Sequence, residues 1–285
     1  MKKRYFKYFF SILAILIAFI MVQKTGLSKL ETSSKTLLMA NWLNELKKDP
    51  FFSDLNENTI QNSTEQYSLT PTHTMLTIPV NIGYKAYLII TTDSSHQEQI
   101  VEYGIGNFLP YQKNIITNQE IRQLTPRSFY YLSPIENFWK FDLGKEIVYI
   151  EGSTGEWLPD LNEQNIRSIQ STFLTYQDHL TEAYDNKNLS FYPSSDLSWL
   201  TISLQNKGIF DLNQIQTLLK NNQKMMFIGN KYNKQVKFAY PIIGYHLWNQ
   251  NQLYLAIYDD DLDLLRFISL EDLLKFGQIV AWTNR

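Results

Sequence analysis

The residues that could carry out nucleophilic, acid–base or metal chemistry are few in this chain. There is no cysteine among the 285 residues, which excludes disulfides, thiolate metal sites, a lipid-modified cysteine and a cysteine nucleophile. None of the four histidines lies within helical reach of another, so a histidine-rich metal site is not expected. They are His73, His96, His179 and His246. We therefore expect no cofactor.

Three further motifs could bind a ligand or react, but each fits a structural role better. Asp259, Asp260, Asp261 and Asp263 lack the glycine and the glutamate that complete a calcium loop, so we expect a solvated turn. The glycines of EYGIGNF (102–108) lack the strand–turn–helix setting of a dinucleotide site. The serines of YPSSD (192–196) suit a turn or a helix cap better than a nucleophile.

Composition limits the class of protein. Apolar residues make up 44% of the chain and charged residues 19%, which supports a globular core and argues against global disorder. The net charge of −2 leaves no basic surface of the kind that binds nucleic acid, so no nucleic-acid partner is expected.

The N-terminus predicts a membrane segment. Basic residues in MKKRYFK precede an uncharged run of 15 residues from Tyr8 to Val22, which as a helix would measure about 22 Å against a hydrocarbon core of about 30 Å. No A-x-A-like cleavage site follows, so an uncleaved signal-anchor is favoured over a cleaved signal peptide or a core helix. The charge bias predicts a single-pass bacterial cell-membrane protein with its C-terminal part extracellular. The alternative is secretion after signal cleavage.

The remaining elements divide the chain into segments. After a membrane segment at 1–28, residues 29–72 predict a helix that ends at Asp49-Pro50 and a polar linker. Residues 73–160 contain short aromatic and β-branched runs typical of strands. Residues 161–285 alternate helices, near 162–184 and 211–222, with strands. We expect an α+β fold with an N-terminal membrane helix and a β-rich middle module.

One turn in the middle module resembles a known motif. YIEGSTGEWLP (149–159) is similar to the strand-end turn of PepSY-like modules, small exported inhibitor or propeptide domains, with Glu151-Gly152 in place of the usual Asp-Ala. The alternative is an ordinary hairpin with a Thr-Gly turn.

Residues 211–282 resemble the C-terminal half of papain-fold cysteine peptidases of the double-glycine-leader, bacteriocin-processing type. The order of a helix and strands agrees with that family, as do motif residues in the strands and the last helix. These are Ala239, Ile242, Gly244, Tyr245, Tyr254, Asp259, Phe267, Ser269, Leu270 and Leu273. The resemblance implies a papain-like C-terminal domain at 161–285.

The residues that would perform peptidase chemistry are missing. Phe238 stands where that family has its catalytic histidine, and a phenyl ring cannot accept a proton. With no cysteine nucleophile, Asp259 at the orienting position completes no triad. His246 lies eight residues further along the strand, about 26 Å at ~3.3 Å per residue, too far to replace the missing base. We therefore expect a non-catalytic, peptidase-like protein.

The sequence thus predicts a membrane-anchored, extracytoplasmic protein that binds a peptide or a protein partner. The predicted cleft contains Phe238, Tyr245, Asp259 and Trp199. Two alternatives remain open: an exported hydrolase built on Asp259, His246 and a serine, and a structural envelope protein. The identity of the ligand, cleavage of the signal and the oligomeric state do not follow from the sequence.

The C-terminal strands carry a specific structural prediction. FAYPIIGYH (238–246) and LYLAIYD (253–259) should form an antiparallel hairpin with a buried apolar face. Gly244 should lie where close backbone leaves no room for a side chain. Pro241 lacks an N–H, so its strand should be at an edge, bulged or unpaired there. Ser269, with Asp272 three positions later, should begin a short helix.

Overall fold

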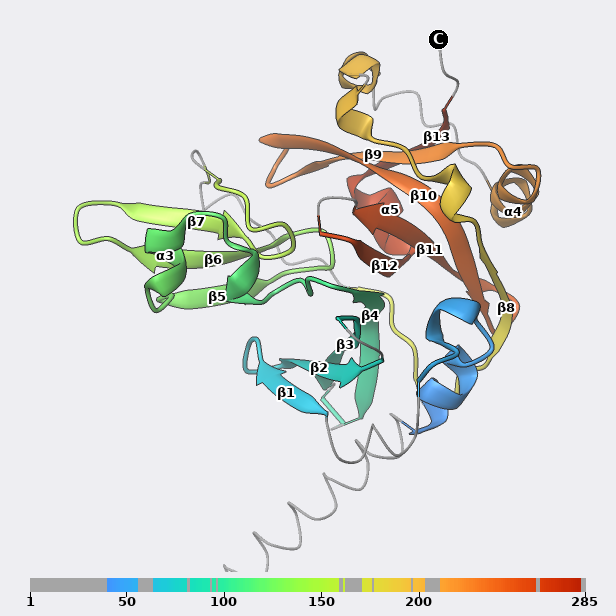
Figure 1. Ribbon diagram of the computed structural model, residues 1–285, viewed down its shortest axis with the longest axis horizontal. Coiled ribbons are helices and arrows are strands. Elements are labelled where there is room, and N and C mark those ends of the chain that lie inside the picture. The colour runs from blue at the N-terminus through green and yellow to red at the C-terminus, as the bar shows by residue number, and fades with distance from the viewer. Residues whose placement is uncertain are drawn as a thin grey trace, which may run out of the picture.

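The computed structural model describes residues 40–282 apart from short gaps (Figure 1). The gaps are residues 56–63, 81–82, 93, 96, 159–160, 162–170, 176, 196, 203–210 and 260–261. His96, Asp260 and Asp261 therefore lie outside the described residues.

One antiparallel sheet of ten strands forms the body of the molecule, in the order β1-β2-β3-β4-β12-β11-β10-β9-β13, with β8 also pairing with β10. Its strands are β1 (Glu65–Ser68), β2 (His73–Pro79), β3 (Lys85–Thr92), β4 (Glu98–Gly106), β8 (Leu180–Asp185), β9 (Met225–Lys231), β10 (Val236–Trp248), β11 (Gln252–Asp259), β12 (Leu264–Ser269) and β13 (Gly277–Ala281). Because β4 pairs with β12, this sheet contains strands from both predicted segments, 73–160 and 161–285.

A second sheet of three strands projects to one side of the first (Figure 1). It consists of β5 (Ser128–Tyr131), β6 (Asn137–Asp142) and β7 (Ile147–Glu151). The helix α3 (Gln119–Gln123) and the 3-10 turn η2 (Lys113–Ile115) cover it, and Ile121 and Ile115 pack against Trp139 and Ile150. The short aromatic runs of residues 128–152 thus form strands, as predicted.

The helices are short. Residues 40–46 are helical and bury Trp42, Leu43 and Leu46, and the chain then enters a 3-10 turn after Asp49, where the sequence predicts a helix end. The other helical elements are η1 (Pro50–Phe52), η4 (Lys187–Leu189), η5 (Pro193–Ser195), η6 (Leu197–Thr201), α4 (Leu212–Lys220) and α5 (Leu270–Phe276). Ser269 caps α5 by accepting a hydrogen bond from Asp272 N at 3.0 Å, which confirms the predicted helix start.

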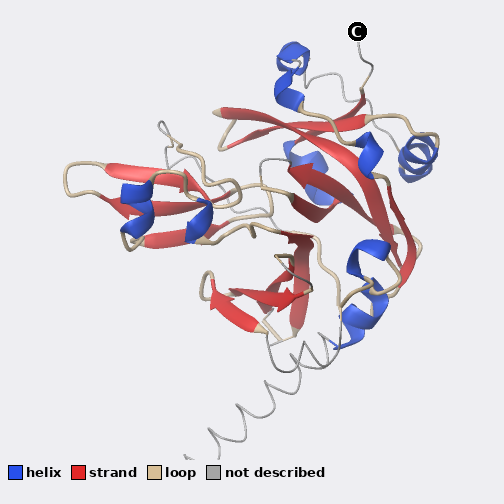
Figure 2. Ribbon diagram, in the orientation of Figure 1, coloured by secondary structure: helices blue, strands red, loops and turns tan. Residues whose placement is uncertain are grey.

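These elements correct the predicted fold class. Figure 2 shows strands dominating the described chain, with short helices between them. The fold is a β-rich antiparallel one, so the expected α+β fold with a papain-like C-terminal domain is wrong. The reason is strand pairing over long sequence distances: one continuous sheet joins β2–β4 to the C-terminal strands, where two separate domains were expected.

One predicted helix is also partly wrong. A helix is expected near residues 162–184, but residues 180–185 form β8, which pairs with the end of β10. Pairing with β10 satisfies the backbone of this short segment and buries Leu180, so tertiary contacts override the local helical pattern. Residues 162–170 lie outside the described part.

The β10–β11 hairpin has the predicted form. Ile242 pairs with Ile257 and Tyr245 with Leu255, and the register shifts between Ile242 and Gly244. Pro241 pairs with Met226 of β9, while pairing with β11 begins only at Ile242, so its other side has no strand partner in the described chain. A Cβ on Gly244 would lie 2.2 Å from the Tyr184 carbonyl oxygen. The predictions for Pro241 and Gly244 are therefore confirmed.

The predicted membrane span requires a correction. Within residues 40–282, gaps excluded, no helix is long and apolar enough to cross a membrane. The longest helix with described bounds, α4, has nine residues, whereas about 20 are needed. The predicted signal-anchor, residues 8–22, lies outside the described residues. The single-pass membrane location and the membrane as partner are accordingly not retained.

Candidate functional site

The four predicted cleft residues do not converge on one pocket. Phe238 is buried against Phe227 and Tyr240, with ring centroids 5.6 and 5.3 Å away. Tyr245, on the other half of the same strand, donates a hydrogen bond to Glu182 Oε1 at 2.6 Å.

The other two cleft residues are held in local turns. Trp199, in η6, donates to the Pro193 carbonyl at 2.9 Å and packs on Met226 and Ile228. Asp259 ends β11 and accepts a hydrogen bond from Leu262 N at 3.2 Å. Neither of the two pockets described below is lined by any of the four predicted cleft residues.

His246 belongs to a buried hydrogen-bonded chain. Its Nε2 bonds to the carboxylate of Asp49, and its Nδ1 lies 2.9 Å from the Tyr103 hydroxyl. Trp248 Nε1 donates to the same hydroxyl at 2.8 Å. A single direction of donation satisfies every member: Trp248 to Tyr103, Tyr103 to His246 Nδ1, and His246 Nε2–H to Asp49. Burial lowers the pKa of His246 despite the opposing effect of Asp49, in keeping with this neutral tautomer.

This chain gives no support to the hydrolase alternative. His246 is fully buried, and its two ring nitrogens are bonded to the Tyr103 hydroxyl and the Asp49 carboxylate, so none of the hydrogen bonds in the described structure places a serine beside the ring. Its carboxylate partner is Asp49, 197 residues away, and Asp259 makes its bond in its own turn. The sequence did not indicate the pairing of His246 with Asp49, because the Asp49-Pro50 dipeptide predicted only the end of a helix.

A second carboxyl group lies against Asp49. Partial burial and the neighbouring Asp49 carboxylate raise the pKa of Asp185 to about 6. Asp49 also accepts a hydrogen bond from Phe51 N at 2.8 Å, which fixes the start of η1. The end of β8, the start of η1 and the C-terminal part of β10 are thus joined by one polar cluster.

The predicted PepSY-like turn holds a buried ion pair. Glu151, at the end of β7, bonds to Lys231 Nζ at the end of β9, and both side chains are almost fully buried. Ser153 and Thr154 of the same turn each donate to Glu151 at 3.2 Å. Although burial opposes it, the charge of Glu151 raises the pKa of Lys231. The turn therefore links the small sheet to the large one.

The larger of the two described pockets lies beside the Asp49 cluster. We call it the Lys187 pocket; its volume is about 340 Å³. It is lined by Pro50, Phe51, Asp54, Tyr84, Ile105, Lys187, Ile243, Tyr258, Asp263 and Leu265. Residues from η1, β3, β4, η4, β10, β11 and β12, or from the turns next to them, thus meet at one place.

The acidic turn supplies the polar wall of this pocket. Asp263 accepts hydrogen bonds from Tyr84, from Tyr258 at 2.7 Å and from Asn107 Nδ2 at 2.8 Å. Although partial burial opposes ionisation, these bonds and the charge of Lys187 lower the pKa of Asp263. The predicted solvated turn thus contains a carboxylate tied to two tyrosines, and we find no cluster of metal-binding side chains in the described part of the chain.

The polar groups of the Lys187 pocket have defined roles toward a ligand. The hydroxyl groups of Tyr84 and Tyr258 both donate to Asp263, so toward a ligand their oxygens could act only as hydrogen-bond acceptors. The Lys187 ammonium lies 4.8 Å from the centre of the Phe51 ring and is a donor. Ile105, Ile243 and Leu265, all buried, add apolar surface. The pocket can therefore bind an apolar group flanked by both donors and acceptors.

Comparison with known proteins returned no match: no family model, no curated protein and no solved structure is similar to this chain. The PepSY-like and peptidase-like resemblances of the sequence therefore stay untested, and no family is assigned.

Proposed function

We propose that the protein is a non-catalytic binding protein that holds a peptide, or a segment of a protein partner, in the Lys187 pocket. The observation that carries this proposal is the lining of the pocket, where an apolar floor is combined with oriented acceptors and a cationic donor. Its volume of about 340 Å³ lies at the lower end of the ~300–1,000 Å³ typical of ligand sites, enough for a single large side chain.

A peptide suits this lining better than a purely apolar or purely charged molecule. An aromatic or large aliphatic side chain can pack on Phe51, Ile243 and Leu265. The peptide groups on either side of it offer N–H donors to the oxygens of Tyr84 and Tyr258 and a carbonyl acceptor to Lys187. The walls come from rigid strand ends and two 3-10 turns, so little ordering is needed on binding.

The test is an NMR titration of the protein with two capped tripeptides, acetyl-Gly-Phe-Gly-amide and acetyl-Gly-Ser-Gly-amide. The phenylalanine peptide should shift the backbone signals of Phe51, Ile105 and Ile243, and the serine peptide should bind at least about tenfold more weakly, because it buries no apolar side chain.

Two variants locate the binding. Lys187→Ala should weaken binding several-fold because the pocket loses its donor, and it should fold normally because Lys187 is exposed. Lys145→Ala, which removes an exposed lysine from the β6–β7 turn, is the matched control and should leave binding unchanged. Equal binding of both peptides, or shifts confined to residues away from the pocket, would exclude this function.

A further inference from the structure

The last strand of the large sheet, β13, has a strand partner on one side only. It pairs along its whole length with β9 and ends the sheet, as Figure 1 shows. No strand of the described chain pairs with its other side. An edge of this kind is a template on which another strand can pair.

The alternation of an antiparallel ladder shows which backbone groups of β13 face this open side. Trp282 N, directly after the strand, donates to the Lys224 carbonyl at 2.7 Å and so marks a hydrogen-bonded pair. Because such pairs alternate along the ladder, Val280 bonds inward to β9, whereas Ile279 and Ala281 turn their N–H and C=O groups outward. The open edge therefore presents donors and acceptors in strand geometry.

The side chains of β13 do not guard this edge. Natural edge strands are commonly blunted by charged residues or by proline. The strand at the opposite end of the sheet, β1, carries Glu65, which forms an ion pair with Lys85 at 3.1 Å. The sequence of β13, GQIVA, contains neither a charge nor a proline. Pairing at this edge therefore meets no charge repulsion from the strand itself.

Both faces of β13 are covered, so its edge is the part that a partner can reach. Ile279 is buried in the main core on one face, and Val280 packs with Trp199 of η6 on the other. The chain around η5 and η6 also exposes three large apolar side chains. These are Tyr192, Leu197 and Leu200, which are 58%, 55% and 46% exposed. Exposed apolar side chains gathered in one place are typical of surfaces that bind another protein.

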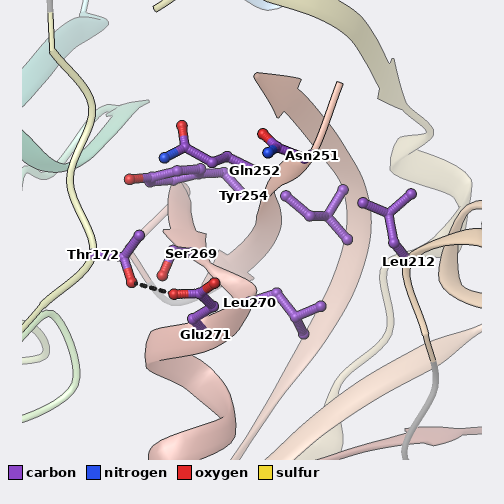
Figure 3. A pocket seen from close by; sticks show the side chains of 9 residues that line it. Thr172, Leu212, Asn251, Gln252, Tyr254, Ser269, Leu270 and Glu271 are labelled. Carbon is purple, nitrogen blue, oxygen red and sulfur yellow. Dashed lines mark hydrogen bonds between the residues drawn. The ribbon is translucent and has the colours of Figure 1, made fainter. Parts of the chain in front are cut away.

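The helix before β13 holds the edge in place. The Gly277 N–H closes the last turn of α5 on the Leu273 carbonyl, and β13 begins at the same glycine. The first turn of α5 is fixed by the Thr172 hydroxyl, which donates to Glu271 Oε2 at 3.0 Å (Figure 3). The smaller of the two pockets, about 130 Å³, lies at this contact, between α5, β11 and the start of α4. Little ordering of β13 is therefore needed when it pairs.

We propose that the protein forms a symmetric dimer in which β13 of one copy pairs antiparallel with β13 of a second copy. A two-fold axis at Ile279, the middle residue of the strand, places its outward N–H and C=O groups against those of Ile279 in the second copy. The same axis places the Ala281 N–H of each copy against the Gly277 carbonyl of the other. This dimer does not depend on the function proposed for the Lys187 pocket.

A second copy fits this edge better than an unrelated strand does. The outward groups are complementary to themselves about the centre of the strand, and the residues that meet beside the axis, Gly277 and Ala281, are too small to clash. The axis is perpendicular to the sheet, so the exposed apolar residues around η5 and η6 lie on the same face in both copies. They add apolar area that two five-residue strands lack against the roughly 1,200–2,000 Å² of a standard interface.

Analytical ultracentrifugation of the full chain over a dilution series tests the dimer. Ala281→Pro should raise the dissociation constant of the dimer at least about tenfold, because it removes an outward N–H that acts twice by symmetry. The monomer should still fold, since Ala281 is exposed and this N–H does not bond to β9. Ala281→Ser keeps the N–H, so it is the matched control and should dimerise as the unaltered protein does.

An introduced cysteine locates the interface, because the chain has none of its own. In the proposed pairing the two Ala281 Cα atoms lie about 14 Å apart, from four residues of strand rise and one strand spacing. Ala281→Cys should therefore be linked into covalent dimers by a flexible bis-maleimide of that reach. Tyr67→Cys, exposed on β1, is the control and should run as a monomer on a denaturing gel.

Three results overturn the proposal. These are a monomer throughout the dilution series, an unchanged dissociation constant in Ala281→Pro, and crosslinking of Tyr67→Cys in place of Ala281→Cys. A monomer would mean that a strand of a different protein takes this edge or that the edge stays open, and either outcome excludes a second copy as its occupant. If Ala281→Pro fails to fold, the crosslinking of the two cysteine variants decides alone.

Discussion

The His246 imidazole and the Asp49 carboxylate are hydrogen-bonded in the fully buried interior, although 197 residues separate them along the chain. This contact ties the segment that precedes the first strand to the C-terminal part of β10 in the large sheet. Together with the bond to the Tyr103 hydroxyl, it fixes the His246 ring in the interior.

Loss of the Asp49 carboxylate should destabilise the fold. Asp49→Ala leaves the His246 Nε2–H and the Phe51 N–H without their acceptor in a dry environment. We expect the free energy of unfolding to fall by about 3 kcal/mol, measured by urea denaturation at pH 7. Asp54→Ala, at an exposed position close by, should change it by less than about 0.5 kcal/mol. Equal effects of the two substitutions would show that the buried chain contributes nothing.

Asp185 should make the protein less stable as the pH rises, whereas a salt-bridged carboxylate makes a protein more stable as the pH rises. Its pKa is raised from 3.8 to about 6 in the folded protein, so between those values the folded state binds more protons than the unfolded state. Stability from this group is therefore present at low pH and is lost as the pH rises toward 6.

The variant Asp185→Asn isolates this effect. As the pH rises from 4 to 7, the melting temperature of the unaltered protein should fall relative to that of the variant. His246, whose pKa is lowered, contributes the opposite trend below about pH 6.5, but it is present in both proteins and cancels in the difference. A difference that is constant with pH would contradict the raised pKa.

Gly244→Val should be strongly destabilising. The new Cβ would lie 2.2 Å from the Tyr184 carbonyl oxygen and 2.8 Å from Asp185 Cα, both of them backbone atoms of β8 that cannot rotate away. We expect a cost of at least about 2 kcal/mol in chemical denaturation, with β8 losing its protection from hydrogen exchange first. Gly144→Ala is the control, since a Cβ there meets no atom within 4 Å and only its positive φ opposes the change. If both substitutions lowered the free energy of unfolding by similar amounts, β8 would be able to move away from the new side chain with little loss of stability.

The sequence predicted local structure better than it predicted contacts. The short aromatic and β-branched runs of residues 73–160 were correctly predicted to form strands, and LYLAIYD (253–259) lies within β11. Pro241 was correctly interpreted because the missing N–H is a property of the residue itself. The failures concern partners that lie far away in the chain. β8 pairs with β10, and β4 pairs with β12, although Gly106 and its partner Leu264 lie far apart in the sequence. The pattern of apolar residues within a strand does not indicate which distant strand it pairs with.

The two described pockets likewise depend on contacts between distant segments, and none of the four predicted cleft residues lines them. Phe238, Tyr245, Asp259 and Trp199 were grouped by a resemblance, whereas the Lys187 pocket is built from turns and strand ends of seven elements. Nothing in the sequence around Phe51 or Tyr84 indicates that they meet.

The ion pair of Lys231 and Glu151 gives the last prediction, which concerns how the small sheet is attached to the large one. Lys231→Met removes the only ammonium that bonds to Glu151 in the described structure and leaves a carboxylate that is 1% exposed, bonded only to Ser153 and Thr154. We expect a loss of about 3–5 kcal/mol in the free energy of unfolding. Glu151→Gln on its own should cost comparably, because it leaves Lys231 charged and buried beside the rings of Phe238 and Tyr240.

The double variant Lys231→Met with Glu151→Gln should recover much of the loss, since no unpaired charge is then buried. Urea denaturation at pH 7 measures all four proteins as one double-mutant cycle. If the two losses add without recovery, the pair acts through independent contacts, and the turn is held to β9 by packing and by its own hydroxyl bonds.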